Sequence, residues 1–247
     1  MALVNPSNAS IRPDERLIVA LDADSTAKAQ RIVEDLDGLV SFYKVGLELF
    51  VIGGTQIVDW LIARGKKVFL DLKFNDVPET VTRATRAAAG LGVSLLTVHG
   101  DAAATVRAAV AGRGENSQLK ILAVTVLTSF NAQDIKDMGF AVPLEELALR
   151  RAKQARELGC DGVIASAHEA KKIREAAGPD LLIVTPGIRP KGVGHQDQKR
   201  VMTPHDALSA GADYLVVGRA ITAAPDPRAS AESVLAEMRN ALGASVR

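Results

Sequence analysis

One stretch decides how this sequence is interpreted: Val68-Phe69-Leu70-Asp71-Leu72-Lys73-Phe74-Asn75-Asp76-Val77-Pro78-Glu79-Thr80. It begins as an apolar run typical of a buried strand and ends in Asp-x-Lys-x-x-Asp at the start of a helix. Because successive side chains of a strand point to opposite faces, Asp71 and Lys73 share one face. If the leucines on the other face pack against helices, the two charges point into the interior of the sheet or its mouth. Buried charges are costly unless paired, so the pattern favours chemistry, with a structural ion pair as the alternative.

The composition indicates an ordinary soluble globular protein. The chain has 247 residues, of which 47% are hydrophobic and 24% are charged, and no shift in composition marks a linker. The 30 Lys and Arg residues nearly balance the 29 Asp and Glu residues, so no global field attracts nucleic acid or an anionic membrane. Aromatic residues make up only 4%, which argues against base-stacking surfaces. We therefore expect neither nucleic-acid nor membrane partners.

Cysteine usage and the chain start favour a cytoplasmic location. A single cysteine, Cys160, cannot form an intramolecular disulfide, which suits a reducing compartment. Residues 1–15 are polar and lack the apolar core of a signal peptide, and no uncharged apolar run is long enough to span a bilayer. We expect residues 1–14 to be a polar tail and residues 15–247 to be one catalytic domain.

Apolar segments alternate with amphipathic segments along the whole chain. The expected strands are 17–22, 42–46, 67–73, 94–99, 120–127, 162–166, 181–185 and 214–218. The expected helices are 26–37, 53–63, 77–89, 102–111, 132–138, 143–158, 169–177, 203–210 and 229–242. Strands that alternate with helices predict a parallel sheet, and eight such units in this length predict a closed (β/α)8 barrel, the TIM barrel. An open doubly wound sheet is the weaker alternative, because no G-x-G-x-x-G follows the first strand.

Polar residues gather where each predicted strand ends, which is the edge at which (β/α)8 barrels carry their active sites. These residues are Asp22, Lys44, Asp71, Lys73, His99, Asp101, Thr128, Ser129, Ser166, His168, Gly218 and Arg219. A purely structural barrel gives no reason for this arrangement, so we expect an active site at this rim. The histidines also fit plain structural roles, as a satisfied buried group or a helix cap. No trio of His, Asp, Glu or Cys has the spacing of metal ligands, so we expect no metal.

Two features near the end of the chain predict a phosphate site. Gly218 lets an anion approach the backbone, and Arg219 supplies a forked donor at the start of a helix. The loop that precedes the last predicted strand, residues 185–204, is long and has no periodicity, which is typical of a functional loop. We interpret it as a lid over the phosphate, with Arg189 and Gln198 able to reach the ligand.

The sequence closely resembles the orotidine 5′-phosphate decarboxylase family over nearly the whole chain. The stretch 71–80 matches that family's Asp-x-Lys-x-x-Asp signature with its following Val-Pro-x-Thr, and Thr185-Pro-Gly-Ile-Arg189-Pro matches its phosphate-loop signature. The first motif alone is weakly specific, because related barrels share it. With Lys44, residues 127–129 and Gly218-Arg219 also in register, the resemblance is specific.

The resemblance implies decarboxylation of orotidine 5′-phosphate to UMP in de novo pyrimidine biosynthesis, without a metal or cofactor. Lys73 would protonate C6 of the pyrimidine within a network of Lys44, Asp71, Lys73 and Asp76, and Asp71 would lie near the substrate carboxylate. Asp22 and Lys44 would bind the ribose, Thr128 and Ser166 the pyrimidine, and Arg189, Gln198, Gly218 and Arg219 the phosphate. The resemblance also implies a homodimer in which Asp76 and Thr80 enter the partner's site.

Three other functions fit parts of the pattern. A sugar-phosphate decarboxylase or synthase of the same barrel group, such as the ketogulonate phosphate enzymes, resembles the chain at Asp-x-Lys-x-x-Asp. Those enzymes require Mg²⁺ and an acid near the end of the second strand, where this chain has Lys44. A phosphosugar isomerase needs an acid–base pair instead of two lysines around an aspartate. A non-catalytic phosphate-binding protein has no need to bury such a charge cluster.

Overall fold

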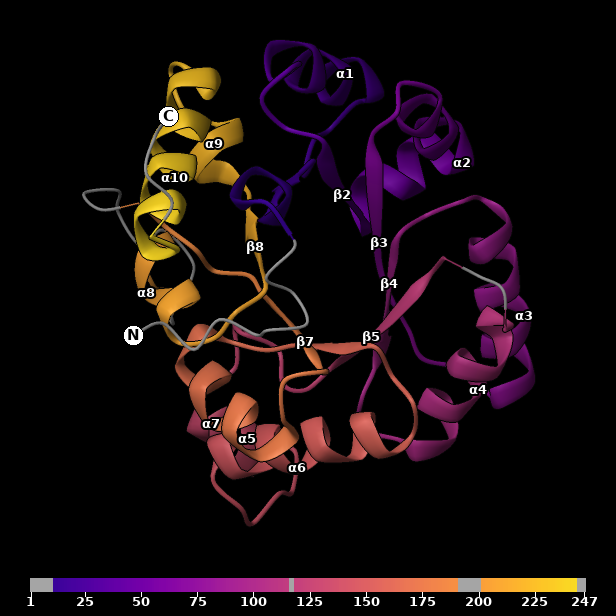
Figure 1. Ribbon diagram of the computed structural model, residues 1–247. Coiled ribbons are helices and arrows are strands. Elements are labelled where there is room, and N and C mark those ends of the chain that lie inside the picture. Colours follow the sequence, from indigo (N-terminus) through magenta and orange to yellow (C-terminus); the bar gives the residue numbers. More distant parts are fainter. Residues whose placement is uncertain (1–10, 116–117, 191–200, 244–247) are drawn as a thin grey trace.

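The described residues, 11–115, 118–190 and 201–243, form one closed barrel in the computed structural model (Figure 1). Its strands are β1 (Leu17–Ala20), β2 (Phe42–Gly46), β3 (Lys67–Phe74), β4 (Leu95–His99), β5 (Lys120–Val124), β6 (Gly162–Ile164), β7 (Leu182–Thr185) and β8 (Tyr214–Val217). Each strand pairs in parallel with the next along the chain, and β8 pairs with β1. The predicted (β/α)8 barrel is confirmed.

Helices surround the barrel as an outer ring (Figure 1). They are α1 (Thr26–Asp35), α2 (Leu47–Ala63), α3 (Pro78–Gly90), α4 (Ala103–Arg113), α5 (Ala132–Asp137), α6 (Leu144–Glu157), α7 (Ala167–Ala177), α8 (Pro204–Ser209), α9 (Arg219–Thr222) and α10 (Pro227–Ala241). None of these described helices combines the length and apolar character that crossing a bilayer requires. The predicted domain boundary stays a prediction, because residues 1–10 of the tail lie outside the described residues.

The element bounds differ from the prediction in helix α2 and at the ends of three strands. Helix α2 begins at Leu47 and not near Gly53, and it is kinked at Gly54, whose φ of 54° only glycine adopts easily. The two glycines made the segment before them look non-helical, whereas it forms a separate short helix. The strands β1, β5 and β6 end two or three residues earlier than predicted, because the residues at their ends leave the pairing to form the rim.

The barrel has an inner and an outer apolar core, and strand alternation assigns each residue to one of them. Phe69 of β3 packs inside the barrel with Ile18, Leu122 and Val184. Leu70 belongs to the larger core between the sheet and the helices. Asp71 and Lys73 continue the inward face of Phe69 with a period of two, so β3 carries its charges toward the mouth of the barrel.

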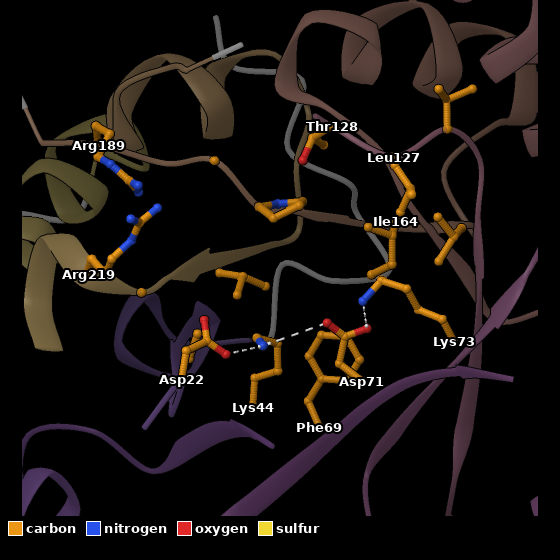
Figure 2. A pocket seen from close by; sticks show the side chains of 17 residues that line it. Asp22, Lys44, Phe69, Asp71, Lys73, Leu127, Thr128, Ile164, Arg189 and Arg219 are labelled. Atoms are coloured by element: carbon orange, nitrogen blue, oxygen red, sulfur yellow. Dashed lines mark hydrogen bonds and ion pairs between the residues drawn. The ribbon is translucent and has the colours of Figure 1, made fainter. Parts of the chain in front are cut away.

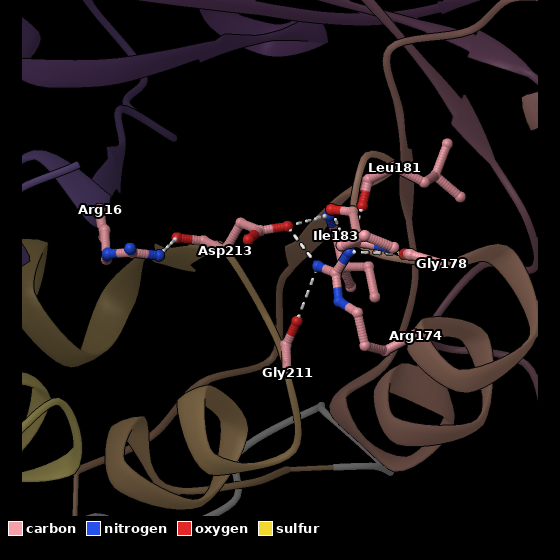
Figure 3. A network of polar contacts seen from close by, with 8 residues as sticks. Arg16, Arg174, Gly178, Leu181, Ile183, Gly211 and Asp213 are labelled. Atoms are coloured by element: carbon pink, nitrogen blue, oxygen red, sulfur yellow. Dashed lines mark hydrogen bonds and ion pairs between the residues drawn. The ribbon is translucent and has the colours of Figure 1, made fainter. Parts of the chain in front are cut away.

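A buried polar network links neighbouring strands at the opposite end of the barrel (Figure 3). Arg174 of α7 forms an ion pair with Asp213, which precedes β8, at 2.6 Å between Nη2 and Oδ2. Arg16, which precedes β1, donates to the Asp213 carbonyl oxygen at 3.2 Å. Burial lowers the pKa of Arg16 from its usual value, and the Asp213 charge acts in the opposite direction. Arg174 also donates to the carbonyl oxygens of Gly178, Pro179, Leu181 and Gly211. The network joins the amino-terminal ends of β7, β8 and β1.

Candidate active site

A cavity of about 220 Å³ opens at the carboxyl ends of the strands (Figure 2). The predicted site residues that line it are Asp22, Lys44, Asp71, Lys73, Thr128, Arg189, Gly218 and Arg219. Its floor is apolar and includes Phe69, Val124, Ile164 and Val216 from the inner core. The cavity therefore combines an apolar floor, on which a flat ring can lie, with charged walls.

Lysines and carboxylates alternate along one wall of the cavity (Figure 2). The Lys44 Nζ lies 2.9 Å from Asp22 Oδ1 and 3.7 Å from Asp71 Oδ2. The Lys73 Nζ lies 2.8 Å from Asp71 Oδ1. The Asp71 and Lys44 side chains are only 14% and 11% exposed, so these charges are little screened by water. Each of these little-exposed charges thus has a partner of opposite charge. The ion pairs offset the desolvation cost of burying the charges and fix the geometry of the cluster.

Local backbone features aim these side chains. Lys73 has φ 49°, which is rare for a residue other than glycine, and the register between β3 and β4 shifts between Leu70 and Phe74. At the end of β2, a Cβ added to Gly46 would lie 2.8 Å from Lys44 Nζ. Glycine at this position therefore leaves the space that the Lys44 ammonium occupies. Neither feature was predicted from the sequence.

Two arginines face each other on the other side of the cavity (Figure 2). Arg219 is the first residue of α9, directly after Gly218, and Arg189 follows β7 in the next segment of chain. Burial lowers the pKa of Arg189 from its usual value, and the positive charge of Arg219 lowers it further. An anion bound beside both guanidinium groups relieves this repulsion and can accept their hydrogen bonds. This end of the cavity is suited to a phosphate.

The remaining predicted residues lie outside the cavity or outside the described residues. Ser166 is buried, and its hydroxyl caps α7 by accepting the His168 N–H at 3.4 Å. Asp76 and Thr80 are exposed beside the start of α3, and Asp76 Oδ1 accepts the Val77 N–H at 2.6 Å. Gln198 lies outside the described residues. The roles assigned to these residues stay predictions.

One polar residue at the site was not predicted. Thr97 of β4 is fully buried, and its hydroxyl lies between the Lys73 amide at 3.0 Å and the Asp71 carboxylate at 2.9 Å. In the sequence it sits in the middle of an apolar strand, where a threonine gives no signal of function. Within the part of the chain that the structure describes, no three His, Cys, Asp or Glu residues are placed to hold a metal ion.

Fold and cavity together define a (β/α)8-barrel enzyme that acts on a small phosphorylated substrate. A family model described as "Orotidine 5'-phosphate decarboxylase / HUMPS family" matches residues 15–234. The chain belongs to this family, which confirms the resemblance seen in the sequence.

Known proteins from several bacteria are similar to the chain over most of their length. The orotidine 5′-phosphate decarboxylase of Nitrobacter winogradskyi is 54% identical over 228 residues, which cover 92% of this chain and 94% of that protein. The one from Methylobacterium radiotolerans is 50% identical, with coverage of 92% and 97%. A crystal structure of the orotidine 5′-phosphate decarboxylase from Lactobacillus acidophilus is 38% identical, has a TM-score of 0.80, and covers 91% of this chain and 99% of that one.

Proposed function

We propose that the protein decarboxylates orotidine 5′-phosphate to UMP, a step of de novo pyrimidine biosynthesis, without a metal or other cofactor. Decarboxylation of this nucleotide is the activity that gives the family its name, and relatives at about half identity are carboxy-lyases of this kind. The observation that carries the assignment of residues is the row of ion pairs Lys44–Asp71–Lys73 on one wall of the cavity. Two arginines line the same cavity.

Lys73 is the proton donor in this proposal. When the bond between C6 and the carboxylate breaks, carbon dioxide leaves and the electron pair stays on C6. The Lys73 ammonium then gives a proton to C6 and is reprotonated from water. A positive charge beside growing negative charge stabilises the transition state more than the ground state, which is what raises kcat. The Lys73 side chain is 28% exposed in the cavity, so a substrate can reach its ammonium.

Asp71 and Lys44 hold Lys73 in place. Each oxygen of the Asp71 carboxylate faces one lysine, so the carboxylate cannot turn without losing an ion pair. In this proposal Asp71 lies beside the substrate carboxylate, and its ion pair with Lys73 orients the ammonium toward the reacting carbon. The sugar-phosphate enzymes that require Mg²⁺ have an acid near the end of the second strand. This chain has Lys44 at that position, and its positive charge repels a cation.

The other residues bind the rest of the nucleotide. Asp22 and Lys44 lie together where hydroxyl groups of a ribose can bond to both. In this proposal Thr128 and Ser166 contact the pyrimidine, while Arg189, Gln198, Gly218 and Arg219 contact the phosphate. Thr128 and the two arginines line the cavity on different sides, which supports this orientation of the ligand (Figure 2).

A homodimer completes the site in our proposal, with Asp76 and Thr80 of each chain entering the partner's cavity. Large apolar side chains are exposed on α2 and directly after Asp76: Leu47 (58%), Val51 (82%) and Ile52 (49%) of α2, and Val77 (63%). Leu47 follows β2 and Val77 follows β3, and these two strands are paired neighbours. A second copy of the chain covers this apolar surface and brings its own Asp76 to the rim.

We also propose a cytoplasmic location, because a single cysteine cannot form an intramolecular disulfide, which suits a reducing compartment. Cys160 is buried, and burial raises the pKa of its thiol to about 12. Such a thiol is a small apolar side chain and not a redox-active group. Fractionation of cells that express the protein checks this location.

The reaction is expected to run without added metal. Purified protein treated with a chelator should consume orotidine 5′-phosphate at the untreated rate, followed as the loss of substrate absorbance, because the wall of the cavity consists of ion-paired lysines and carboxylates. Activity that disappears with the chelator and returns with Mg²⁺ would contradict the assignment and favour a sugar-phosphate type of chemistry.

Arg219→Ala is expected to raise KM and to lower kcat/KM by about 10- to 100-fold, because a charge-assisted hydrogen bond is worth about 1.5–3 kcal/mol. Binding energy from the remote phosphate also helps to order the site. Steady-state kinetics on the nucleotide measure both constants. Arg150→Ala is the matched control, since Arg150 is an exposed arginine of α6 paired with Glu146. If the Arg219 variant behaved like the control, the phosphate would bind elsewhere.

A further inference from the structure

We propose that Thr97 is the positioning residue that fixes the proton-donating Lys73, an inference that rests on the role proposed for Lys73. Thr97 touches neither the cavity nor, in this proposal, the substrate. It acts through the backbone of Lys73 and through the carboxylate that holds the Lys73 ammonium.

Between two paired positions, β3 has two more residues than β4, and Thr97 is the residue of β4 at this point. Leu70 pairs with Leu96, and Phe74 pairs with Val98, so Asp71, Leu72 and Lys73 stand opposite Thr97 alone. Such a bulge removes ladder hydrogen bonds and redirects side chains. The Lys73 amide donates instead to the Thr97 hydroxyl oxygen at 3.0 Å. A side chain thus replaces the backbone acceptor that a regular strand would supply.

The backbone of Lys73 needs this support. Within the described residues, Lys73 is the only residue other than glycine with a positive φ. Such conformations persist only where the surroundings hold them in place, and they are concentrated at functional sites. The hydrogen bond from the Lys73 amide to Thr97 is the contact that fixes the peptide group at this point.

The same hydroxyl also fixes the charge partner of Lys73. The Thr97 hydroxyl donates to Asp71 Oδ1 at 2.9 Å, and this oxygen accepts from Lys73 Nζ at 2.8 Å. The Thr97 hydroxyl therefore bonds directly to the backbone N–H of Lys73. It also holds the Asp71 oxygen that accepts from the Lys73 ammonium. Thr97 is 0% exposed, so water cannot take the place of the hydroxyl when it is removed.

Thr97→Val tests the proposal, because it keeps the shape of the side chain and removes only the hydroxyl. We expect kcat to fall about 10- to 100-fold, since a misplacement of about 1 Å in a reacting group can cost 10²-fold. KM for orotidine 5′-phosphate and the affinity for UMP should change less than about threefold, because the groups that bind ribose and phosphate are untouched. Thr97→Ser restores the hydroxyl and should return kcat to within about threefold of the native value.

Thr125→Val is the matched control. Thr125 follows β5, is 1% exposed, and donates its hydroxyl to the Ile164 carbonyl oxygen at 2.9 Å. Its substitution removes a buried hydroxyl of the same kind without touching Asp71 or Lys73, so kcat should stay near native. If Thr97→Val does not fold, Thr97→Ala lacks the same hydroxyl and serves in its place.

Amide hydrogen exchange of Lys73, measured by NMR without nucleotide, provides a readout independent of activity. It should be slow in the native protein and in Thr97→Ser, and at least about tenfold faster in Thr97→Val. A native kcat in Thr97→Val, equal losses in both valine variants, or a loss of UMP affinity as large as the loss of kcat would overturn the proposal. A native protein inactive on orotidine 5′-phosphate would contradict the proposed function instead, and the exchange rates would still decide whether Thr97 holds Lys73.

Discussion

Lys73→Ala is expected to lower kcat for orotidine 5′-phosphate by about 10⁴-fold. The variant loses both the proton donor, typically worth about 10²–10⁴, and the positive charge beside C6, for which loss of one such stabilising group costs about 10²–10³. The two effects belong to one side chain and are not expected to multiply fully. The affinity for UMP, measured by calorimetry, should stay measurable, because the arginines and the ribose-binding pair are intact.

Lys67→Ala is the control for this variant. Lys67 begins the same strand, β3, but lies exposed at its amino-terminal end, far along the strand from the cavity. Its replacement should leave kcat native. A Lys73→Ala protein with near-native kcat would exclude Lys73 as the proton donor.

Mixing two inactive variants is expected to restore activity if the site is shared between subunits. Lys73→Ala and Asp76→Ala dimers should each be nearly inactive. After subunit exchange, a hybrid has one site with both defects and one site with neither. In an equal random mixture about half of the dimers are hybrids with one intact site each, so recovery should approach about one quarter of native activity.

The control for the mixing experiment is a pair of variants that share one cavity. Asp71 contacts Lys73 within the same chain, so every site of a Lys73→Ala and Asp71→Ala hybrid has one defect, and mixing should restore nothing. Subunit exchange must be shown separately, for example by fluorescence transfer between labelled chains. Proven exchange without recovery in the Lys73 and Asp76 pair would mean that Asp76 serves its own barrel.

The sequence was sufficient to predict the barrel and most of the wall of its cavity. Strand alternation predicted that Asp71 and Lys73 share one face. The place of Leu70 in the outer core makes that face the inward one, and both charged residues line the cavity. The strand ends predicted the rim residues for the same reason, since parallel strands deliver their carboxyl ends to one edge. Both inferences depend on local periodicity, which a single sequence contains.

Other parts of the structure depend on contacts between distant segments. Nothing in the residues around Lys73 indicates a positive φ, which arises from the mismatch between β3 and β4. Thr97 was missed because its partners lie on another strand. Arg174 was missed because it lies in an amphipathic helix, where an arginine is normally exposed, and its partner Asp213 is far along the chain. Such pairings become visible only when the strands are placed in register.

The buried network of Arg16, Arg174 and Asp213 has an evolutionary consequence. It links neighbouring strands at their amino-terminal ends, whereas the groups that contact the ligand stand at the carboxyl ends. A mutation that changes the reaction or the substrate acts on residues at the rim. It need not alter the hydrogen bonds of this network, which join β7 and β8 to β1. Descendants of one gene can exchange rim residues and acquire new substrates while they inherit the same network.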